Sequence, residues 1–300
     1  MPNFSIIITC HNQQKYIADT IRSALAQQVA KDVIVVDDAS TDKSVHILWQ
    51  FGDQICLLRL EKNQGPNVAR NMGAAAAKGD YLVFLDGDDL LLPWALEIYS
   101  RIVCVKNPKI ILGRLLFFEG PAPTPAFNSF GSELEVVDYP LLIRKDRTYR
   151  GSASAIVIER RAFEAVGGWT KEFFPSDIDD LVVKLGYSGH AIHILSHPTT
   201  LYRVHESNTV HQVGRFLQTM RMIINKEKRG EYPGGKDGRF ERYTFIGGPV
   251  FFWFMRGMRR GIYWSSFKLL VSGWLMVAAA IASKAAVKIR GIRTVETIRI

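Results

Sequence analysis

Cysteine is scarce in this chain of 300 residues, which contains only Cys10, Cys56 and Cys104. Their number is odd and no C-x-x-C pair occurs, so we expect neither a disulfide framework nor a zinc knuckle. We also expect no signal peptide, because the apolar run of residues 4–10 is too short and no basic residue precedes it. These absences favour a reducing, cytosolic compartment.

Acidic residues are scarce in the last part of the chain. Residues 214–300 contain 17 Lys and Arg but only 5 Asp and Glu, a net charge of +12, whereas residues 1–213 carry a net charge of −3. This asymmetry indicates two parts with different partners, and not a protein that is basic throughout, as many nucleic-acid-binding proteins are. We therefore predict a domain over residues 1–213, with halves 1–106 and 107–213, and a basic region over 214–300.

Short apolar runs alternate with helical patterns through the first hundred residues. Strands are predicted at 4–10, 32–37, 54–60 and 80–86. Three helices are predicted between these strands. The first is indicated by Ile17, Ile21 and Leu25, which are spaced four residues apart. The second is expected at residues 41–51, with Ser40 as N-cap, and the third at residues 66–77. This alternation indicates a mostly parallel, Rossmann-type α/β sheet with helices on both faces, and such sheets bind ligands at the carboxyl ends of their strands.

The pattern is less regular after residue 93. Helices are expected at 93–105, 160–166, 178–186 and 214–228. Extended segments are expected at 109–118, 154–158 and 190–204, and a loop rich in Pro, Gly and Ser at 119–132. No internal repeat is present.

Three carboxylates follow the strand of residues 80–86. Asp86, Asp88 and Asp89 would lie together at the edge of the sheet, where their like charges repel one another. A divalent cation relieves such repulsion, and oxygen ligands suit Mg²⁺ or Mn²⁺ bound with substrate phosphates. The alternative is a solvated acidic turn that caps the next helix. The position after a fourth strand favours the metal site.

Polar residues also end the other strands. The strand of residues 32–37 leads into Asp37 and Asp38, where a carboxylate could accept hydrogen bonds from a base or a ribose. Capping of the next helix would explain Ser40, Thr41 and Asp42, but not these two acids. The first strand leads into Thr9, His11 and Asn12, and the segments before the fourth strand contain Asn63 and Arg70.

The ordered segments SIIITCHN, VIVVDDASTD and NQGPNVARNMGAAAAKGDYLVFLDGDD resemble the nucleotide-sugar-binding half of family 2 glycosyltransferases, which have the GT-A fold. The family usually has P-T-Y-N where this chain has Thr9-Cys10-His11-Asn12. His11 thus replaces an aromatic residue that packs on the base, and an imidazole can still stack there. The substrate-binding residues that the resemblance implies are Thr9, His11, Asn12, Asp38, Asn63, Arg70, Asp86 and His205.

The resemblance continues to about residue 210. Gly167-Gly168-Trp169 is similar to the family's G-G-[FW]-D-E segment, and residues 177–185 are similar to E-D-x-D-L-x-x-R-L, in which an acid is the catalytic base. Aligned without a gap, Ile178 takes the position of that acid, and a slip of one residue makes Asp177 the base. We prefer Asp177, with Asp179 as the second candidate and Asp180 left open. The alternative is that these acids only favour a helix N-terminus.

The segment Tyr202-Arg203-Val204-His205 resembles the family's Y-R-x-H, whose His lies near the diphosphate and the metal. The resemblance therefore implies Mn²⁺ or Mg²⁺ bound by Asp88, Asp86 and His205, and inverting transfer of a sugar from a nucleotide-diphosphate sugar to an acceptor hydroxyl. Two other functions stay open. A nucleotidyltransferase would have a Gly-rich phosphate loop after the first strand, but residues 9–15 contain no Gly. A non-catalytic membrane scaffold would have lost the carboxylates.

The basic region resembles no part of that family. It contains Trp253, Trp264 and Trp274, and its longest uncharged run, residues 269–282, is shorter than the roughly 20 residues of a spanning helix. We predict a helical amphipathic extension, peripheral or monotopic at the cytoplasmic face of the inner (plasma) membrane, where a lipid-linked or other glycan acceptor would be presented. The alternative is packing on the core or in a homo-oligomer. A nucleic-acid partner is not expected.

Overall fold

A computed structural model describes residues 2–121, 123, 133–145, 151–290 and 294–299. Its main sheet has nine strands in the order β12-β8-β10-β6-β9-β4-β1-β2-β3, and β9 and β8 run against the other seven. The predicted α/β class with a mostly parallel sheet is confirmed. Most of the loop predicted at 119–132 lies outside the described residues.

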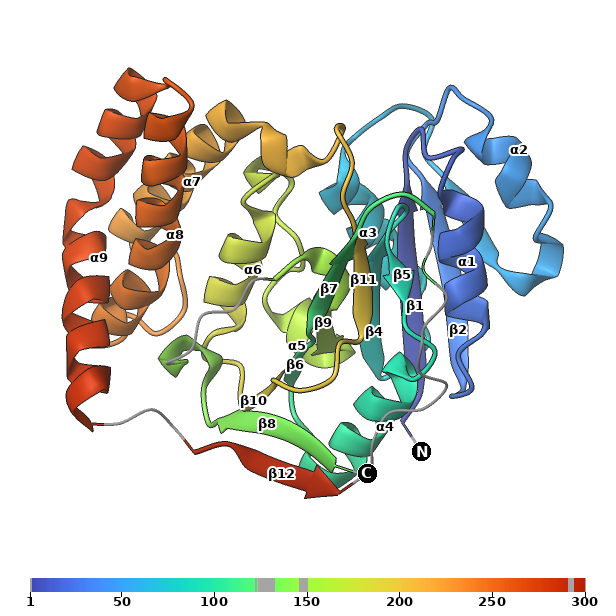
Figure 1. Cartoon of the computed structure of the whole chain (residues 1–300), viewed down its shortest axis with the longest axis horizontal. Coiled ribbons are helices and arrows are strands. Elements are labelled where there is room, and N and C mark those ends of the chain that lie inside the picture. Colours follow the sequence, from blue (N-terminus) through green and yellow to red (C-terminus); the bar gives the residue numbers. More distant parts are fainter. Residues whose placement is uncertain (1, 122, 124–132, 146–150, 291–293, 300) are drawn as a thin grey trace.

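The first half follows the predicted alternation closely (Figure 1). The third strand is shorter than predicted, and the second helix begins later, at Ser44, because Ser40 and Thr41 bond to Asn12 in the preceding loop instead of capping the helix. The elements are β1 (Phe4–Cys10), α1 (Ile17–Leu25), β2 (Lys31–Asp37), α2 (Ser44–Trp49), β3 (Cys56–Arg59), α3 (Pro66–Ala76) and β4 (Tyr81–Asp86).

The second half extends the sheet and adds a small one. The strands β5, β11 and β7 form a separate three-stranded sheet in the order β5-β11-β7. The elements are β5 (Leu90–Leu91), α4 (Ala95–Lys106), β6 (Ile110–Leu112), β7 (Leu115–Phe118), β8 (Glu133–Tyr139), β9 (Ile156–Glu159), α5 (Arg160–Ala165), α6 (Asp177–Leu185), β10 (Ala191–Ile194) and β11 (Thr200–Arg203).

Alternating side chains of the central strands fill two cores. In β1, Ile6 and Ile8 point to a cluster that contains residues of α1 and α4, whereas Ile7 points to a cluster with residues of α3, α5 and α6. Helices therefore cover both faces, and the strand-end residues that follow β1, β2 and β4 are held on a rigid support.

Three long helices stand together beside the sheet (Figure 1): α7 (Val213–Lys228), α8 (Arg239–Arg259) and α9 (Tyr263–Arg290). They share a third core cluster that includes Met220, Val250 and Met276. The chain then returns to the main sheet, where β12 (Glu296–Arg299) pairs antiparallel with β8. The basic region thus consists mainly of three helices up to Arg290, and its last strand belongs to the sheet.

Within the described part of the chain, one helix is long and apolar enough to cross a membrane by length and composition alone. It is residues Tyr263–Val287 of α9, with a mean hydropathy of 1.7, and 22% of that stretch is buried. The uncharged run of residues 269–282 lies inside this longer helix.

Candidate active site

The carboxyl ends of β1, β2 and β4 meet at one edge of the sheet. The parallel register aligns Thr9 with Asp86 and Cys10 with Asp37. The chain turns directly after β4 at Gly87, where an added Cβ would lie 2.6 Å from the backbone oxygen of Thr9. Only glycine fits this close approach, and the turn brings Asp88 and Asp89 to the same edge as Asp86.

Arg70 of α3 joins Asp86 to the start of α6. Its Nη2 donates to Asp86 Oδ1 at 2.7 Å and its Nη1 to Asp177 Oδ2 at 2.6 Å, while its guanidinium carbon lies 4.8 Å from the centre of the Trp169 ring. Arg70 is only 4% exposed. The predicted substrate-binding arginine is therefore an internal bridge that sets the spacing of two candidate carboxylates.

Asp88 contacts His205, which is distant in the sequence. His205 Nε2 lies 2.9 Å from Asp88 Oδ2, and its ring stacks on Tyr16 with centroids 5.2 Å apart. Ser207 Oγ, at 2.8 Å from Nδ1, contacts the opposite side of the imidazole. Two of the three residues predicted to bind a metal are thus neighbours with fixed orientations.

Asp89 ties the acidic turn to the second half of the chain. Its side chain accepts hydrogen bonds from Ser154 Oγ at 2.6 Å and from the backbone N–H of Arg203 at 3.0 Å. Burial, followed by the charges of Asp88 and Asp86, raises the pKa of Asp89 well above its usual value. Asp89 therefore holds the turn in place and is closed off from a ligand.

The predicted residues after β1 organise the neighbouring loop. His11 Nδ1 lies 2.8 Å from the backbone oxygen of Asp38, and Asn12 Oδ1 accepts from the backbone N–H of Thr41 at 2.8 Å. The side chain of Thr9 faces Asp86 at 3.5 Å. His11 and Asn12 are exposed, so their free edges are available to a ligand.

Asp38 and Asn63 hold the loop that precedes α3. Both oxygens of Asp38 accept backbone N–H groups, from Gln64 at 2.7 Å and from Gly65 at 2.8 Å. Asn63 is exposed, and its Oδ1 accepts from Gly65 at 3.2 Å. Asp38 thus shapes the loop through its carboxylate, and its part in binding a base or ribose remains a prediction.

The three acids of α6 have different surroundings. Asp177 is buried against Arg70, and its burial raises the pKa of its carboxyl even though Arg70 acts to lower it. Asp179 is half-buried; desolvation and then the charge of Asp177 raise its pKa to about 7. Asp180 is fully buried and accepts hydrogen bonds from Thr170 at 2.7 Å, Lys226 at 2.7 Å and Tyr232 at 2.6 Å.

The donor chemistry of Asp88 and His205 fits a divalent cation. One carboxylate and one imidazole, each partly exposed, leave coordination positions for substrate phosphate and water. Asp86, the third predicted ligand, turns its Oδ1 to Arg70. In the described parts of the chain, no group of three or more His, Cys, Asp or Glu side chains is arranged to hold a metal ion.

Three further residues support the site, and two of them carry no clear signal in the sequence. Arg203 lies between the rings of Tyr16 and Phe118, at 4.7 and 4.6 Å, and its Nε donates to the backbone oxygen of Asp88 at 3.0 Å. Ser154 Oγ accepts from the backbone N–H of Asp86 at 3.0 Å. The segment around His205 pointed to Arg203, but no local pattern pointed to Tyr16 or Ser154.

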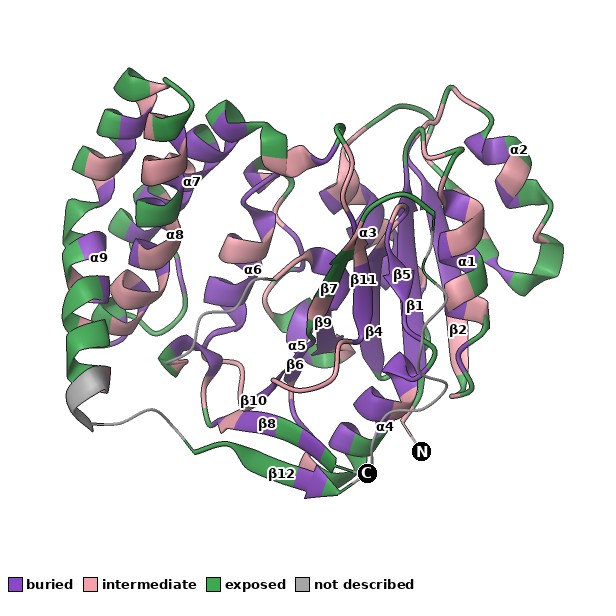
Figure 2. Ribbon diagram, in the orientation of Figure 1, coloured by how far each residue is buried: buried purple, intermediate pink, exposed green. Residues whose placement is uncertain are grey.

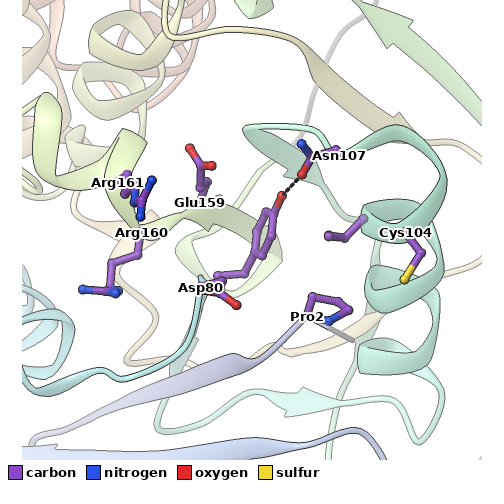
Figure 3. Close-up of a pocket in the computed structure, with 9 residues that line it drawn as sticks. Pro2, Asp80, Cys104, Asn107, Glu159, Arg160 and Arg161 are labelled. Atoms are coloured by element: carbon purple, nitrogen blue, oxygen red, sulfur yellow. Dashed lines mark hydrogen bonds between the residues drawn. The ribbon is translucent and has the colours of Figure 1, made fainter.

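A hollow of about 500 Å³ lies at the opposite, amino end of the strands. Figure 3 shows Glu159, Arg160 and Arg161 on one side of it and Cys104 and Asn107 on the other. It is remote from the strand-end carboxylates, and ligands of open α/β sheets bind at the carboxyl edge. The carboxyl edge is therefore the better candidate for the active site.

Comparison with solved structures defines the class of fold. The structure superposes on the crystal structure of Staphylococcus aureus TarS residues 1–349 with a TM-score of 0.68 at 16% identity, covering 95% of this chain and 82% of that one. It also matches the mannosyltransferase PcManGT of Pyrobaculum calidifontis, in complex with GDP-Man and Mn²⁺, with a TM-score of 0.54 at 15% identity, covering 94% and 87%. The chain has the GT-A fold of glycosyltransferases.

Sequence comparison points to the same class of enzyme. Residues 5–125 match the model of glycosyl transferase family 2. It is 29% identical over 187 residues to an uncharacterized glycosyltransferase of Haemophilus influenzae, covering 60% of this chain and 61% of that protein. It is 35% identical over 145 residues to the poly(ribitol-phosphate) beta-N-acetylglucosaminyltransferase TarS of S. aureus, covering 46% and 25%. The chain spans between 27% and 61% of the length of the first three curated relatives that it matches.

Proposed function

We propose that this protein transfers a sugar from a nucleotide-diphosphate sugar to an acceptor hydroxyl with inversion, in the synthesis of a bacterial cell-surface glycan. The observation that carries the proposal is the contact between Asp88 and His205, 117 residues apart, beside the Arg70 bridge at the carboxyl edge of a GT-A fold. The names of the glycosyltransferase relatives, TarS among them, support this reaction class.

Asp88 and His205 would hold Mn²⁺ or Mg²⁺, with Asp86 as a further oxygen donor. The Mn²⁺ complex of the structurally similar mannosyltransferase supports this choice of cofactor. When bound, the cation neutralises negative charge on the nucleoside diphosphate that leaves. The stacking of His205 on Tyr16 and its contact with Ser207 fix the imidazole plane. The chain thereby keeps the edge of His205 turned to Asp88.

Asp177 is the general base in this proposal. A base must first lie within reach of the acceptor, and Arg70 holds Asp177 beside Asp86 at the edge where the donor would bind. The base takes the proton of the acceptor hydroxyl as its oxygen attacks the anomeric carbon from the face opposite the diphosphate. Asp179 is the rival, since its pKa of about 7 is well matched to neutral pH. The three buried hydrogen bonds that Asp180 accepts favour a structural role for it over that of the base.

An aromatic pair offers a surface for the acceptor. Phe117 of β7 and Tyr202 of β11 are neighbours in register, with ring centroids 5.3 Å apart, and Phe117 is 53% exposed. Burial and the charges of Asp89, Asp86 and Asp88 raise the pKa of Tyr202, so this pair adjoins the acidic edge. A pyranose ring of the acceptor can pack on such rings.

We further propose that the helical region binds a membrane surface and brings the enzyme to a lipid-linked acceptor. Large apolar side chains stand exposed along α8 and α9, and Figure 2 shows the exposed residues along the outer side of α9. On α9 they recur at steps of three and four, which places them on one face. This outer apolar face consists of Phe251, Phe252, Trp264, Phe267, Val271, Trp274, Leu275 and Ile281.

The inner side of α9 is packed on protein, which favours an interfacial position over a spanning one. An added Cβ at Gly247 would lie 2.0 Å from the backbone oxygen of Met276, and one at Gly273 would lie 2.9 Å from Ile224. The outer apolar face is therefore the side of α9 that can enter lipid. Exposed Arg259, Arg260 and Lys268 beside it suit anionic headgroups.

The proposed reaction is tested by incubating the protein with UDP-glucose, UDP-GlcNAc and GDP-mannose, with Mn²⁺ or with EDTA, and measuring release of the nucleoside diphosphate. Release from one donor, dependent on Mn²⁺ and lost in Asp88→Ala, is expected. Formation of a nucleotide-sugar from a nucleoside triphosphate and a sugar phosphate would instead identify a nucleotidyltransferase. Absence of both activities, with no nucleotide binding, would favour the scaffold.

A further inference from the structure

Helix α7 lies against the start of α6, the segment that carries the candidate bases. Ser176, the residue before α6, makes no capping bond to its own helix; its Oγ instead lies 2.7 Å from Thr219 Oγ1 of α7. Val183 of α6 belongs to the same core cluster as Phe216 and Leu217 of α7. The first turn of α6 is thus held by a helix from the C-terminal region.

A buried ionic contact strengthens this attachment. Lys226 Nζ of α7 and the hydroxyl of Tyr232 both donate to the same oxygen of Asp180, at 2.7 and 2.6 Å, and Asp180 is fully buried. Removing one partner from a buried charge is strongly unfavourable, so the contact fixes the helix firmly. Lys226 also lies over the rings of Phe173, at 5.0 Å, and of Tyr232, at 4.4 Å.

The segment that carries Tyr232 is itself fixed, although it is rich in Gly and Pro. Arg242 of α8 donates to the backbone oxygens of Pro233 and Gly235, both at 2.7 Å, and to Glu227 of α7 at 2.6 Å. Arg242 is 1% exposed. Tyr232 therefore reaches Asp180 from a rigid support.

We propose that Lys226 and Tyr232 are positioning residues for the reaction: acting through Asp180, they hold the first turn of α6 so that its candidate bases face the donor edge. This inference rests on the proposed glycosyl transfer. Asp177 lies three residues before Asp180, about one helical turn, so a shift of that turn moves Asp177 against Arg70. Both positioning residues lie outside residues 5–125, the span of the family match. Two residues of the C-terminal region then position the proposed base, in addition to the membrane binding proposed for that region.

The test compares Tyr232→Phe and Lys226→Met with Lys228→Met, which changes an exposed lysine of the same helix. The measurements are kcat and KM for hydrolysis of the best donor among UDP-glucose, UDP-GlcNAc and GDP-mannose, and hydrogen exchange of residues 176–181. We expect kcat to fall about 10- to 100-fold in the first two variants, because small misplacements of a reacting group cost rates of this size. KM for the donor should stay within about twofold, and exchange of residues 176–181 should quicken.

Tyr232→Phe keeps the ring and its packing, so it separates positioning from loss of the fold. If both variants match Lys228→Met in kcat and in exchange, the inference is overturned. An equal loss of kcat and of donor binding, with faster exchange throughout the chain, would also overturn it. A wild-type protein that cleaves none of the three donors would count against the proposed function, whereas the exchange comparison would still show whether α7 holds α6.

Discussion

Replacing Arg70 tests the bridge between the sheet edge and α6. In Arg70→Met the methionine still fills space beside Trp169, but Asp177 and Asp86 lose a donor at 2.6 and 2.7 Å. Breaking a buried ion pair from one side typically costs about 3–5 kcal/mol, because a charge is left buried without its partner. We expect a loss of about 4 kcal/mol in the free energy of unfolding at pH 8, a large share of the stability of a typical domain.

The sign of the pH dependence follows from Asp177. Its carboxyl already has a raised pKa in the folded protein, and Arg70 is the partner that lowers it. Without Arg70 the folded-state pKa rises further, so the folded variant binds more protons than the unfolded chain above about pH 4. The folded variant also binds more protons than the folded wild type as pH rises through the raised pKa of Asp177, so its stability relative to the wild type falls there, and the loss should be smaller at pH 5 than at pH 8.

Urea unfolding monitored by circular dichroism at pH 5 and at pH 8 measures this difference. Arg22→Met is the matched control, since Arg22 forms an exposed ion pair with Asp19 at 3.1 Å and should cost less than about 1 kcal/mol at either pH. A loss in Arg70→Met no larger than that of the control, or one that does not change with pH, would refute the bridge as a buried, charged link.

Three further predictions concern the base, the acidic turn and the membrane. Asp177→Asn should lower kcat about 10²–10⁴-fold with unchanged donor binding. In Asp179→Asn the acid limb of the pH–rate profile should persist. A limb near pH 7 that vanishes in Asp179→Asn would instead make Asp179 the base. Gly87→Ala should weaken binding of UDP with Mn²⁺ at least tenfold by calorimetry, because the new Cβ displaces the turn that carries the acids; equal affinity would contradict this. Trp274→Ser should lower the fraction of protein that floats with anionic liposomes about tenfold or more, because burying a large apolar side chain contributes about 1.5–3 kcal/mol. A wild-type protein that is soluble without detergent and does not bind such liposomes would refute the membrane proposal.

Much of the fold could be predicted from the sequence, because its strands are short, apolar and regularly spaced. The buried run from Phe4 to Cys10 and the helical spacing of Ile17, Ile21 and Leu25 are local signals, and both elements lie where expected. The strands β8 and β12 could not be predicted in the same way. Their pairing joins Val136 to Glu296, residues far apart in the chain, and exposed polar positions in β12 give no strand pattern.

The residues that form the site could be predicted from the sequence, but the contacts among their side chains could not. The strand-end position of Asp86, Asp88 and Asp89 follows from the sequence, yet their separate partners do not. Asp86, Asp88 and Asp89 contact Arg70, His205 and Ser154 respectively, and these contacts depend on tertiary packing. Asp180 was equally ambiguous in sequence, because only the fold brings Lys226 and Tyr232 to it.

The most direct test of the central claim is calorimetry of UDP and GDP binding to the wild type and to Asp88→Ala, each with Mn²⁺ and with EDTA. If a nucleoside diphosphate binds at the edge formed by Asp88 and His205, the wild type should bind it much more tightly with Mn²⁺ than with EDTA. This gain in affinity should be lost in Asp88→Ala. Equal affinity of the wild type in Mn²⁺ and in EDTA, or a gain that survives in Asp88→Ala, would contradict the account.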